Sequence, residues 1–229
     1  MQTRSIARSL ALIGFAGAFS LSAYAAPEDV MVKQTGVVAP GQNTNMFVNG
    51  TTANWWTGMQ SIEVSHDLVG PPFSPSTTFK AFCIDPTHFS STTWQPYKEL
   101  PVATSFPTKA ADIQDLYGHF YRTSMSNFDA AAFQIALWEI ANDDKVLTTG
   151  VVRYTGGGAL GTRVMQMIND VGFTSYVSWN VTTYMVENPP HPGQDFVVAN
   201  PVPEPETYAM MLAGLGLLGV VARRRAGKA

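Results

Sequence analysis

The chain has 229 residues, with 14 Lys and Arg against 17 Asp and Glu. Six of the basic residues and two of the acidic ones lie within the first 25 or the last 27 residues, so residues 26–202 hold 8 basic and 15 acidic side chains. This acidic balance argues against a nucleic-acid partner, because binding to phosphates depends on basic residues. The length of the same segment suits one domain, since ~100 to 200 residues per domain is usual.

The N-terminal 25 residues have the pattern of a secretory signal peptide. A basic start with Arg4 and Arg8 precedes an apolar stretch, and the small residues Ala23 and Ala25 flank Tyr24. This order predicts cleavage by signal peptidase after Ala25. The alternative is a retained anchor, but the apolar stretch is shorter than the ~20 residues that usually span a bilayer.

Two strands are predicted in the first half of the exported segment. Residues 26–53 are polar and rich in Gly, Asn and Thr, which favours a loosely packed segment with one short strand at residues 46–48. Residues 61–69 alternate with a period of two, as a half-buried strand does. Prolines end that strand, and a second strand is expected at residues 78–84.

The middle of the chain changes to a helical period. Apolar residues recur at helical spacing over residues 113–121. A nearly all-apolar helix is expected to begin near Asp129 as its N-cap and to be buried. A third helix is predicted at residues 159–170, and strands return at residues 176–186 and 196–199. Strands, then helices, then strands indicate an α+β fold: a mostly antiparallel sheet or sandwich with a central helical segment on one side. The expected domain covers residues 26–187, followed by an extended strand or linker at residues 188–202.

The C-terminal 27 residues, 203–229, combine three features in order. The motif Pro203-Glu204-Pro205 precedes an apolar segment at residues 208–222, and the arginines Arg223, Arg224 and Arg225 follow. Such an apolar helix with a cationic end is expected in a membrane, with the arginines on the cytoplasmic side. The alternative interpretation of this segment is an ordinary single-pass tail anchor.

This tail resembles the PEP-CTERM sorting domain of Gram-negative bacteria. The resemblance covers the stretch Val-Pro-Glu-Pro-Glu-Thr-Tyr-Ala-Met-Met-Leu-Ala-Gly-Leu-Gly-Leu-Leu-Gly that starts at Val202, together with the arginine run. It implies that an exosortase reads the Pro-Glu-Pro motif. It also implies transient anchoring in the inner membrane, followed by transfer to the cell surface or the extracellular matrix.

A single cysteine, Cys83, stands out in a chain expected to be exported. Exported cysteines normally pair as disulfides, and an odd one indicates an intermolecular bridge or a reactive thiol. The plainer interpretation is a small buried hydrophobic residue. Gln134 is the second unusual residue, because it lies within the apolar helix. Burying an amide without a partner costs about 1 to 3 kcal/mol, so a hydrogen bond to nearby backbone would be reason enough for it.

Taken together, the segments Phe-Cys-Ile around Cys83 and Phe-Gln-Ile-Ala-Leu-Trp around Gln134 resemble the paired motif of bacterial surface thioester domains. The resemblance implies an internal thioester, with Cys83 as sulfur donor and Gln134 as acyl donor. It further implies that Phe82, Phe133 and Trp138 shield the bond from water.

The function predicted from these features is covalent adhesion. An amine or hydroxyl of an exopolysaccharide or a surface protein would attack the thioester once, so no turnover enzyme is expected. The rival is a non-reactive structural component of a biofilm matrix. A secreted hydrolase is not predicted, because the sequence shows neither paired acidic residues nor a nucleophile with a histidine. No cofactor is expected. The four histidines lack zinc-site spacing, and Asn142-Asp143-Asp144 is interpreted as a solvated helix end, so no metal site is predicted.

Overall fold

The computed structural model describes residues 27–172, 179–187, 193–202, 211 and 213–218. The predicted signal peptide with Ala23 and Ala25 lies outside these residues, as do the Pro203-Glu204-Pro205 motif and the three arginines. Most of the predicted membrane segment at 208–222 is outside them as well. Within the described part of the chain, no helix has both the length and the apolar character needed to cross a bilayer.

Six strands form a closed antiparallel ring, in the order β1-β2-β3-β7-β6-β4 and back to β1. The short strand β5 pairs with the far end of β1, outside the ring. The mostly antiparallel sheet expected from the sequence is therefore confirmed. The strand bounds are β1 Glu28–Val48, β2 Thr51–Ser65, β3 Thr77–Cys83, β4 Gln95–Pro101, β5 Val152–Arg153, β6 Trp179–Val186 and β7 Phe196–Pro201.

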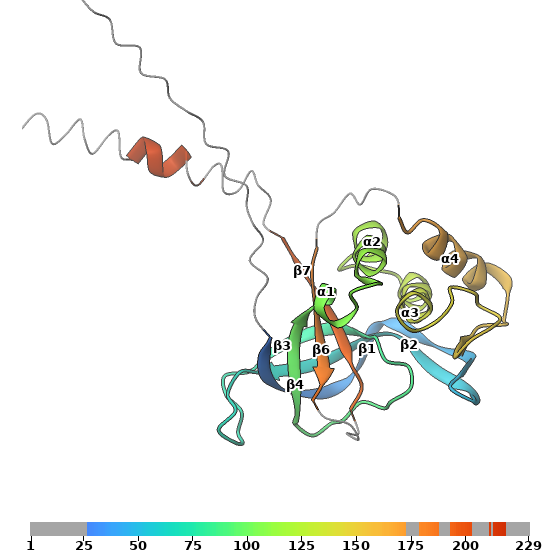
Figure 1. Ribbon diagram of the computed structural model, residues 1–229, viewed down its shortest axis with the longest axis horizontal. Coiled ribbons are helices and arrows are strands. Elements are labelled where there is room, and N and C mark those ends of the chain that lie inside the picture. Colours follow the sequence, from blue (N-terminus) through green and yellow to red (C-terminus); the bar gives the residue numbers. More distant parts are fainter. Residues whose placement is uncertain (1–26, 173–178, 188–192, 203–210, 212, 219–229) are drawn as a thin grey trace, which may run out of the picture.

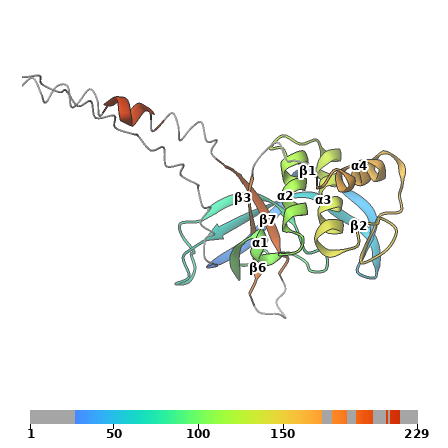
Figure 2. The ribbon, with the colours of Figure 1, turned by 45° about the horizontal axis from the view of Figure 1, so that its top comes forward.

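Four helices lie together on one side of this ring (Figures 1 and 2). They are α1 Val102–Ser105, α2 Ala110–Phe120, α3 Asn127–Asn142 and α4 Gly158–Asn169. Helix α3 lies at their centre, against α2, α4, β1 and β2. Its residues from Ala130 to Ile140 are all buried, as its apolar composition predicts.

Two apolar cores result from the alternation of side chains along the strands. One core fills the ring and receives side chains from all six of its strands, namely Val30, Val32, Ile62, Val64, Ala81, Tyr97, Tyr184, Phe196 and Val198. The other lies between the outer face of the ring and the helices. The alternation is seen at residues 81 and 82, because Ala81 belongs to the core inside the ring while Phe82 belongs to the helix-facing core. Cys83, at the end of β3, also belongs to the helix-facing core.

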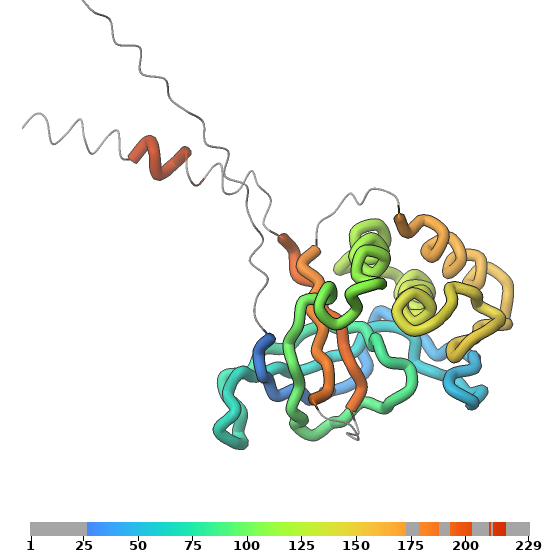
Figure 3. Tube along the Cα trace, viewed as in Figure 1, coloured from blue at the N-terminus to red at the C-terminus, as the bar shows by residue number. Residues whose placement is uncertain are grey.

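The expectation of a loosely packed segment at residues 26–53 is wrong. Most of it belongs to β1, a 21-residue strand that pairs with β2, β4 and β5. The outer half of the β1–β2 hairpin continues past the ring beneath the helices (Figure 3). There Gly41 faces Gly58 so closely that a Cβ on Gly58 would lie 2.4 Å from the Gly41 Cα. The Gly41 N–H also donates to Asn127 Oδ1 at 3.1 Å, which ties the hairpin to the start of α3.

Helix α3 begins slightly earlier than the sequence suggested. Its N-cap is Ser126, not Asp129, and the Ser126 hydroxyl accepts a hydrogen bond from the Asp129 N–H at 3.0 Å. The Ser126 hydroxyl in turn donates to the Asp129 carboxylate at 2.7 Å. Asp129 therefore occupies the third position of the first turn, where an acidic side chain also favours the positive end of the helix dipole.

Candidate functional site

The structure brings Cys83 and Gln134 together from distant parts of the chain. Cys83 is the last residue of β3, and Gln134 lies in the middle of α3. The Gln134 side chain pairs with the Cys83 backbone twice: its Oε1 accepts from the Cys83 N–H at 3.2 Å, and its Nε2 donates to the Cys83 carbonyl at 2.7 Å. Both residues have an exposed fraction of 0%. The buried amide thus has two partners, and both belong to the cysteine.

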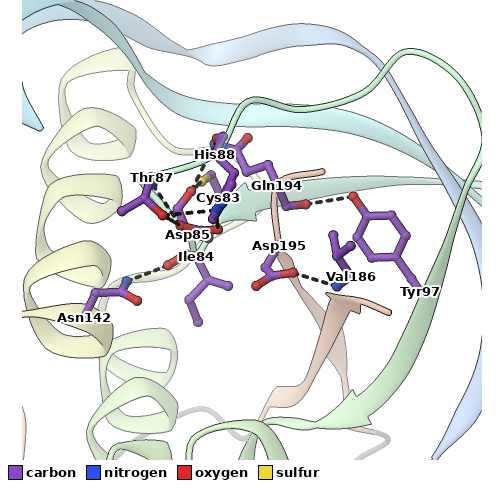
Figure 4. A network of polar contacts seen from close by, with 10 residues as sticks. All are labelled: Cys83, Ile84, Asp85, Thr87, His88, Tyr97, Asn142, Val186, Gln194 and Asp195. Carbon is purple, nitrogen blue, oxygen red and sulfur yellow. Dashed lines mark hydrogen bonds and ion pairs between the residues drawn. The ribbon is translucent and has the colours of Figure 1, made fainter. Parts of the chain in front are cut away.

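The backbone after Cys83 is held from two sides (Figure 4). On the sheet side, the Ile84 N–H donates to the Asp195 carbonyl at 2.9 Å, just before β7. On the helix side, Asn142 Nδ2 donates to the Ile84 carbonyl at 2.6 Å from the last turn of α3. Cys83 therefore has a fixed position between one strand and one helix, the kind of support that a reactive group requires.

The thiol of Cys83 lies in a dry environment. Its Sγ donates a hydrogen bond to the Asp85 carbonyl at 2.9 Å. Burial raises the pKa of the thiol well above its usual value, while the nearby Trp138 side chain opposes that shift. The Trp138 indole N–H itself makes no regular hydrogen bond to any described residue. At neutral pH the free cysteine is consequently a neutral thiol and a poor nucleophile.

Aromatic rings surround the pair, including the residues predicted to shield it. Phe82 and Phe133 pack with their ring centroids 4.7 Å apart, and Tyr117 meets Phe133 edge-on at 4.9 Å. Tyr121 extends this cluster, with Trp179 edge-on to it at 4.8 Å. Phe82, Phe133 and Trp138 have exposed fractions of 1%, 0% and 3%. Solvent has no direct access to the Cys83–Gln134 pair.

A polar network adjoins the pair on the side of the loop after β3 (Figure 4). His88 Nδ1 lies 2.5 Å from the Asp85 carboxylate, and the His88 side chain is 58% exposed. Gln194 Nε2 donates to the backbone carbonyls of Asp85 and His88 at 3.3 and 3.0 Å. The Gln194 backbone carbonyl accepts a hydrogen bond from Tyr97 Oη at 2.9 Å. This network was not predictable from the sequence, because its members are dispersed along the chain and form no motif.

Asp195 is the charged group most affected by burial in this network. Desolvation raises its pKa to about 6, and the neighbouring charge of Asp85 acts in the same direction. The Val186 N–H, which donates to Asp195 Oδ1 at 2.7 Å, opposes the shift. Because the pKa of an unfolded Asp is ~3.9, ionisation of Asp195 opposes folding. The neutral form of Asp195 therefore favours the folded state. This contribution to the free energy of unfolding is fully present below about pH 4 and is lost as the pH rises through about 6.

Asp195→Asn should therefore stabilise the protein at pH 8 and leave its stability at pH 4 nearly unchanged. The amide keeps an oxygen for the Val186 N–H but carries no charge to desolvate. We expect a gain of about 1 to 2 kcal/mol at pH 8, which allows for partial exposure of the side chain. Urea unfolding at both pH values measures it. Asp67→Asn is the matched control, because Asp67 Oδ1 also accepts a backbone N–H but in a surface turn. An equal gain in both variants would contradict the assignment to Asp195.

Sequence comparison identifies the tail of the chain. Residues 201–225 match the PEP-CTERM protein-sorting motif. The chain carries a PEP-CTERM sorting signal. A PEP-CTERM protein is exported and directed to the surface, and the motif implies processing by an exosortase. A comparison of the whole sequence with curated proteins found no match.

Structure comparison finds similarity to domains of surface proteins from two bacteria. The N-terminal domain of the Streptococcus pyogenes pilus tip adhesin Cpa is 11% identical, with a TM-score of 0.44 over 76% of this chain and 94% of that domain. The N-terminal thioester domain of a surface protein from Clostridium perfringens is 9% identical, with a TM-score of 0.40 over 76% of this chain and 99% of that domain.

Proposed function

We propose that this PEP-CTERM protein attaches covalently to a partner through an internal thioester between Cys83 and Gln134. The observation that carries the proposal is the double hydrogen bond between the Gln134 amide and the Cys83 backbone, at 3.2 and 2.7 Å in a fully buried site. This pairing holds the Gln134 amide against the Cys83 backbone before any bond forms. Such positioning can be worth about 7 to 11 kcal/mol of the barrier to an intramolecular reaction.

Bond formation exchanges an amide for a thioester. Cys83 Sγ attacks the Gln134 carboxamide carbon, the bond from that carbon to Nε2 breaks, and the nitrogen leaves as ammonia with the proton of the thiol. No oxidant or cofactor is required. The high pKa of the buried thiol means that a proton acceptor near Cys83 assists the attack. The Asp85 and Asp195 carboxylates are the acidic groups whose charges act on that thiol.

In partner capture, the leaving group is the Cys83 sulfur rather than ammonia. A partner amine or hydroxyl attacks the Gln134 carbon, the bond from that carbon to Sγ breaks, and Cys83 takes up the proton as a free thiol. The pKa of an ordinary cysteine thiol, ~8.5, lies far below that of an amine or an alcohol, so sulfur is the better leaving group even though burial raises the pKa of Cys83. The aromatic cluster around Phe133 excludes water until a partner docks. Each molecule reacts once, so the protein is an adhesin rather than an enzyme with turnover.

The proposed life cycle places this chemistry outside the cell. Signal peptidase removes residues 1–25, and the apolar segment 208–222 with its arginines holds the precursor briefly in the inner membrane. Exosortase action at Pro203-Glu204-Pro205 then passes the domain to the cell surface or the extracellular matrix. The partner is an amine or hydroxyl group of an exopolysaccharide or of a surface protein.

A second function is that of a non-reactive structural component of the biofilm matrix. The observation in its favour is that every polar atom of the pair already has a partner. The Gln134 amide is satisfied by the Cys83 backbone, and the thiol donates to the Asp85 carbonyl. In this alternative, Gln134 ties α3 to the end of β3, and Cys83 serves as a small core residue.

The intact mass of the exported chain separates the two functions. We expect the wild-type mass to be short by one ammonia and the Cys83→Ala variant to have its full mass. Methylamine should add to the wild type alone and restore a titratable thiol, because it attacks the thioester as a partner amine would. Asp67→Asn, a surface change, should behave as the wild type. A full wild-type mass with no methylamine adduct would reject the covalent function and leave the structural one.

A further inference from the structure

Three carboxylates meet at the carboxyl end of α3, away from the cysteine pair. Glu139 lies in the last turns of the helix, Asp143 is its C-cap, and Asp144 follows. One oxygen from each lies within 4.8 Å of the others. Carbonyl dipoles give the end of a helix a partial negative charge, so this is an unfavourable place for three acidic groups.

Glu139 makes the cluster unusual, because its side chain has an exposed fraction of 0%. Neither of its carboxylate oxygens has a hydrogen-bond partner among the described residues. The Val146 N–H acts to lower the Glu139 pKa, but its regular hydrogen bond goes to Asp144 at 2.9 Å. Burial, with the charges of Asp143 and Asp144, raises the Glu139 pKa to about 8. A buried carboxylate without a partner is costly, and such groups normally are paired or coordinate a metal.

No basic side chain of the described residues compensates the three acidic groups. The last turn of α3 contains no basic residue. Lys145 is the nearest in sequence, but its ammonium pairs with Asp112 at 2.5 Å. Arg153 donates to the Gly150 carbonyl at 2.9 Å and lies over the Phe47 ring. The described side chains therefore supply no positive charge to balance the three groups when all of them are ionised.

The loop after α3 holds the two aspartates in position. Asp143 accepts from the Val152 N–H at 2.7 Å and from the Asp144 N–H at 3.0 Å. Asp144 accepts from the Thr149 hydroxyl at 2.7 Å, in addition to the Val146 N–H. Each carboxylate oxygen can accept more than one interaction, so these bonds orient the groups without using all of their lone pairs.

We propose that Glu139, Asp143 and Asp144 bind a divalent cation of the calcium type. All three ligands are hard carboxylate oxygens, which Ca²⁺ prefers in proteins, and a cation would also favour the negative end of α3. Extracellular calcium modules bind with dissociation constants of about 10⁻⁴ to 10⁻³ M, the range expected for a partly exposed site. The ion would fix the end of α3, from which Asn142 holds the Ile84 carbonyl. This proposal does not depend on the thioester.

Thermal unfolding of the exported chain tests the site. After chelation with EDTA, 10 mM CaCl₂ should raise the Tm by about 3 to 6 °C relative to NaCl of equal ionic strength. Glu139→Gln should abolish this shift, because the neutral amide of the isosteric side chain cannot replace an anionic carboxylate ligand. Asp144→Asn, at an exposed position, should reduce the shift. Glu63→Gln is the matched control, because Glu63 pairs with Lys33 on the sheet and its variant should keep the full shift.

Two results would overturn the proposal. One is the absence of any calcium-dependent shift in the wild type. The other is a shift of equal size in the wild type, Glu139→Gln and Asp144→Asn, which would show that calcium acts elsewhere. Asp144→Asn keeps the test decisive if the buried substitution at Glu139 prevents folding. The intact mass of the same samples reports on the cysteine pair separately, so failure of one proposal does not disguise failure of the other.

Discussion

Replacing Phe133 with alanine should destabilise the domain by about 3 to 5 kcal/mol, because the smaller side chain leaves a cavity that its surroundings fill only in part. Phe133 is fully buried in α3, and its ring packs against Phe82 and Tyr117 at centroid distances of 4.7 and 4.9 Å. Its loss removes contacts between the helix and both the sheet and α2. Urea unfolding followed by tryptophan fluorescence measures the change.

Phe128→Ala provides the matched control within the same helix. Phe128 lies in the first turn of α3 and is 38% exposed, so its removal creates no internal cavity. We expect that variant to lose less than about 1 kcal/mol. Equal losses in the two variants would show that burial in the aromatic cluster does not determine the stability of α3.

Gln134→Leu should cost about 2 to 4 kcal/mol when it is made in a Cys83→Ala background. Alanine at position 83 cannot form a thioester but keeps the backbone N–H and carbonyl that pair with Gln134. Leucine preserves the approximate volume and leaves both of these buried backbone groups without a partner. Each unsatisfied group costs about 1 to 3 kcal/mol. The comparison of single and double variants thus isolates the hydrogen bonds from any covalent contribution.

Gln114→Leu in the same background is the control for the loss of a glutamine. Gln114 is exposed on α2, so its replacement should change the free energy of unfolding by less than about 0.5 kcal/mol. If Gln134→Leu were as mild as Gln114→Leu, the amide would not hold α3 to the end of β3. The pairing of the Gln134 amide with the Cys83 backbone would then have no measurable role in stability.

Segments with one clear period were predictable from the sequence. The alternation in residues 61–69 falls largely in β2, and the helical spacing of Ile113, Leu116 and Tyr117 corresponds to α2, where all three are buried. The apolar run after Asp129 correctly predicted a buried helix. In each case, local spacing and burial favour the same structure, so a single sequence contains enough information.

Segments whose structure depends on distant partners were not predictable. Strand β1 carries polar residues on both faces over much of its length and is interrupted by Gly36, Pro40 and Gly41. It is a strand because β2, β4 and β5 satisfy its backbone, and no local pattern reports those partners. Strand β4 was missed for the same reason, since prolines lie at positions 96 and 101 and charged residues at 98 and 99.

The candidate site was only partly accessible to sequence reasoning. Cys83 is unusual as an unpaired cysteine, and Gln134 is unusual as an amide in an apolar helix. The resemblance to thioester domains predicts that the two residues act as a pair. Glu139 carries a similar signal, a charged residue in the same apolar run, but its significance depends on the loop that brings Asp143 and Asp144 beside it. Asp195 carries no signal at all, because its burial results from the sheet closing around it.

The position of β7 has a consequence for the order in which the molecule can assemble. This strand lies between β3 and β6 in the ring, yet it comes last along the chain and ends at Pro201, one residue before the Val-Pro-Glu-Pro stretch. Until residues 195–201 are in place, the Ile84 N–H lacks its Asp195 acceptor and the ring remains open. The segment that carries the cysteine can therefore adopt its final geometry only when the chain is available up to the residue before the sorting signal. Closure of the ring depends on the last described strand before that signal.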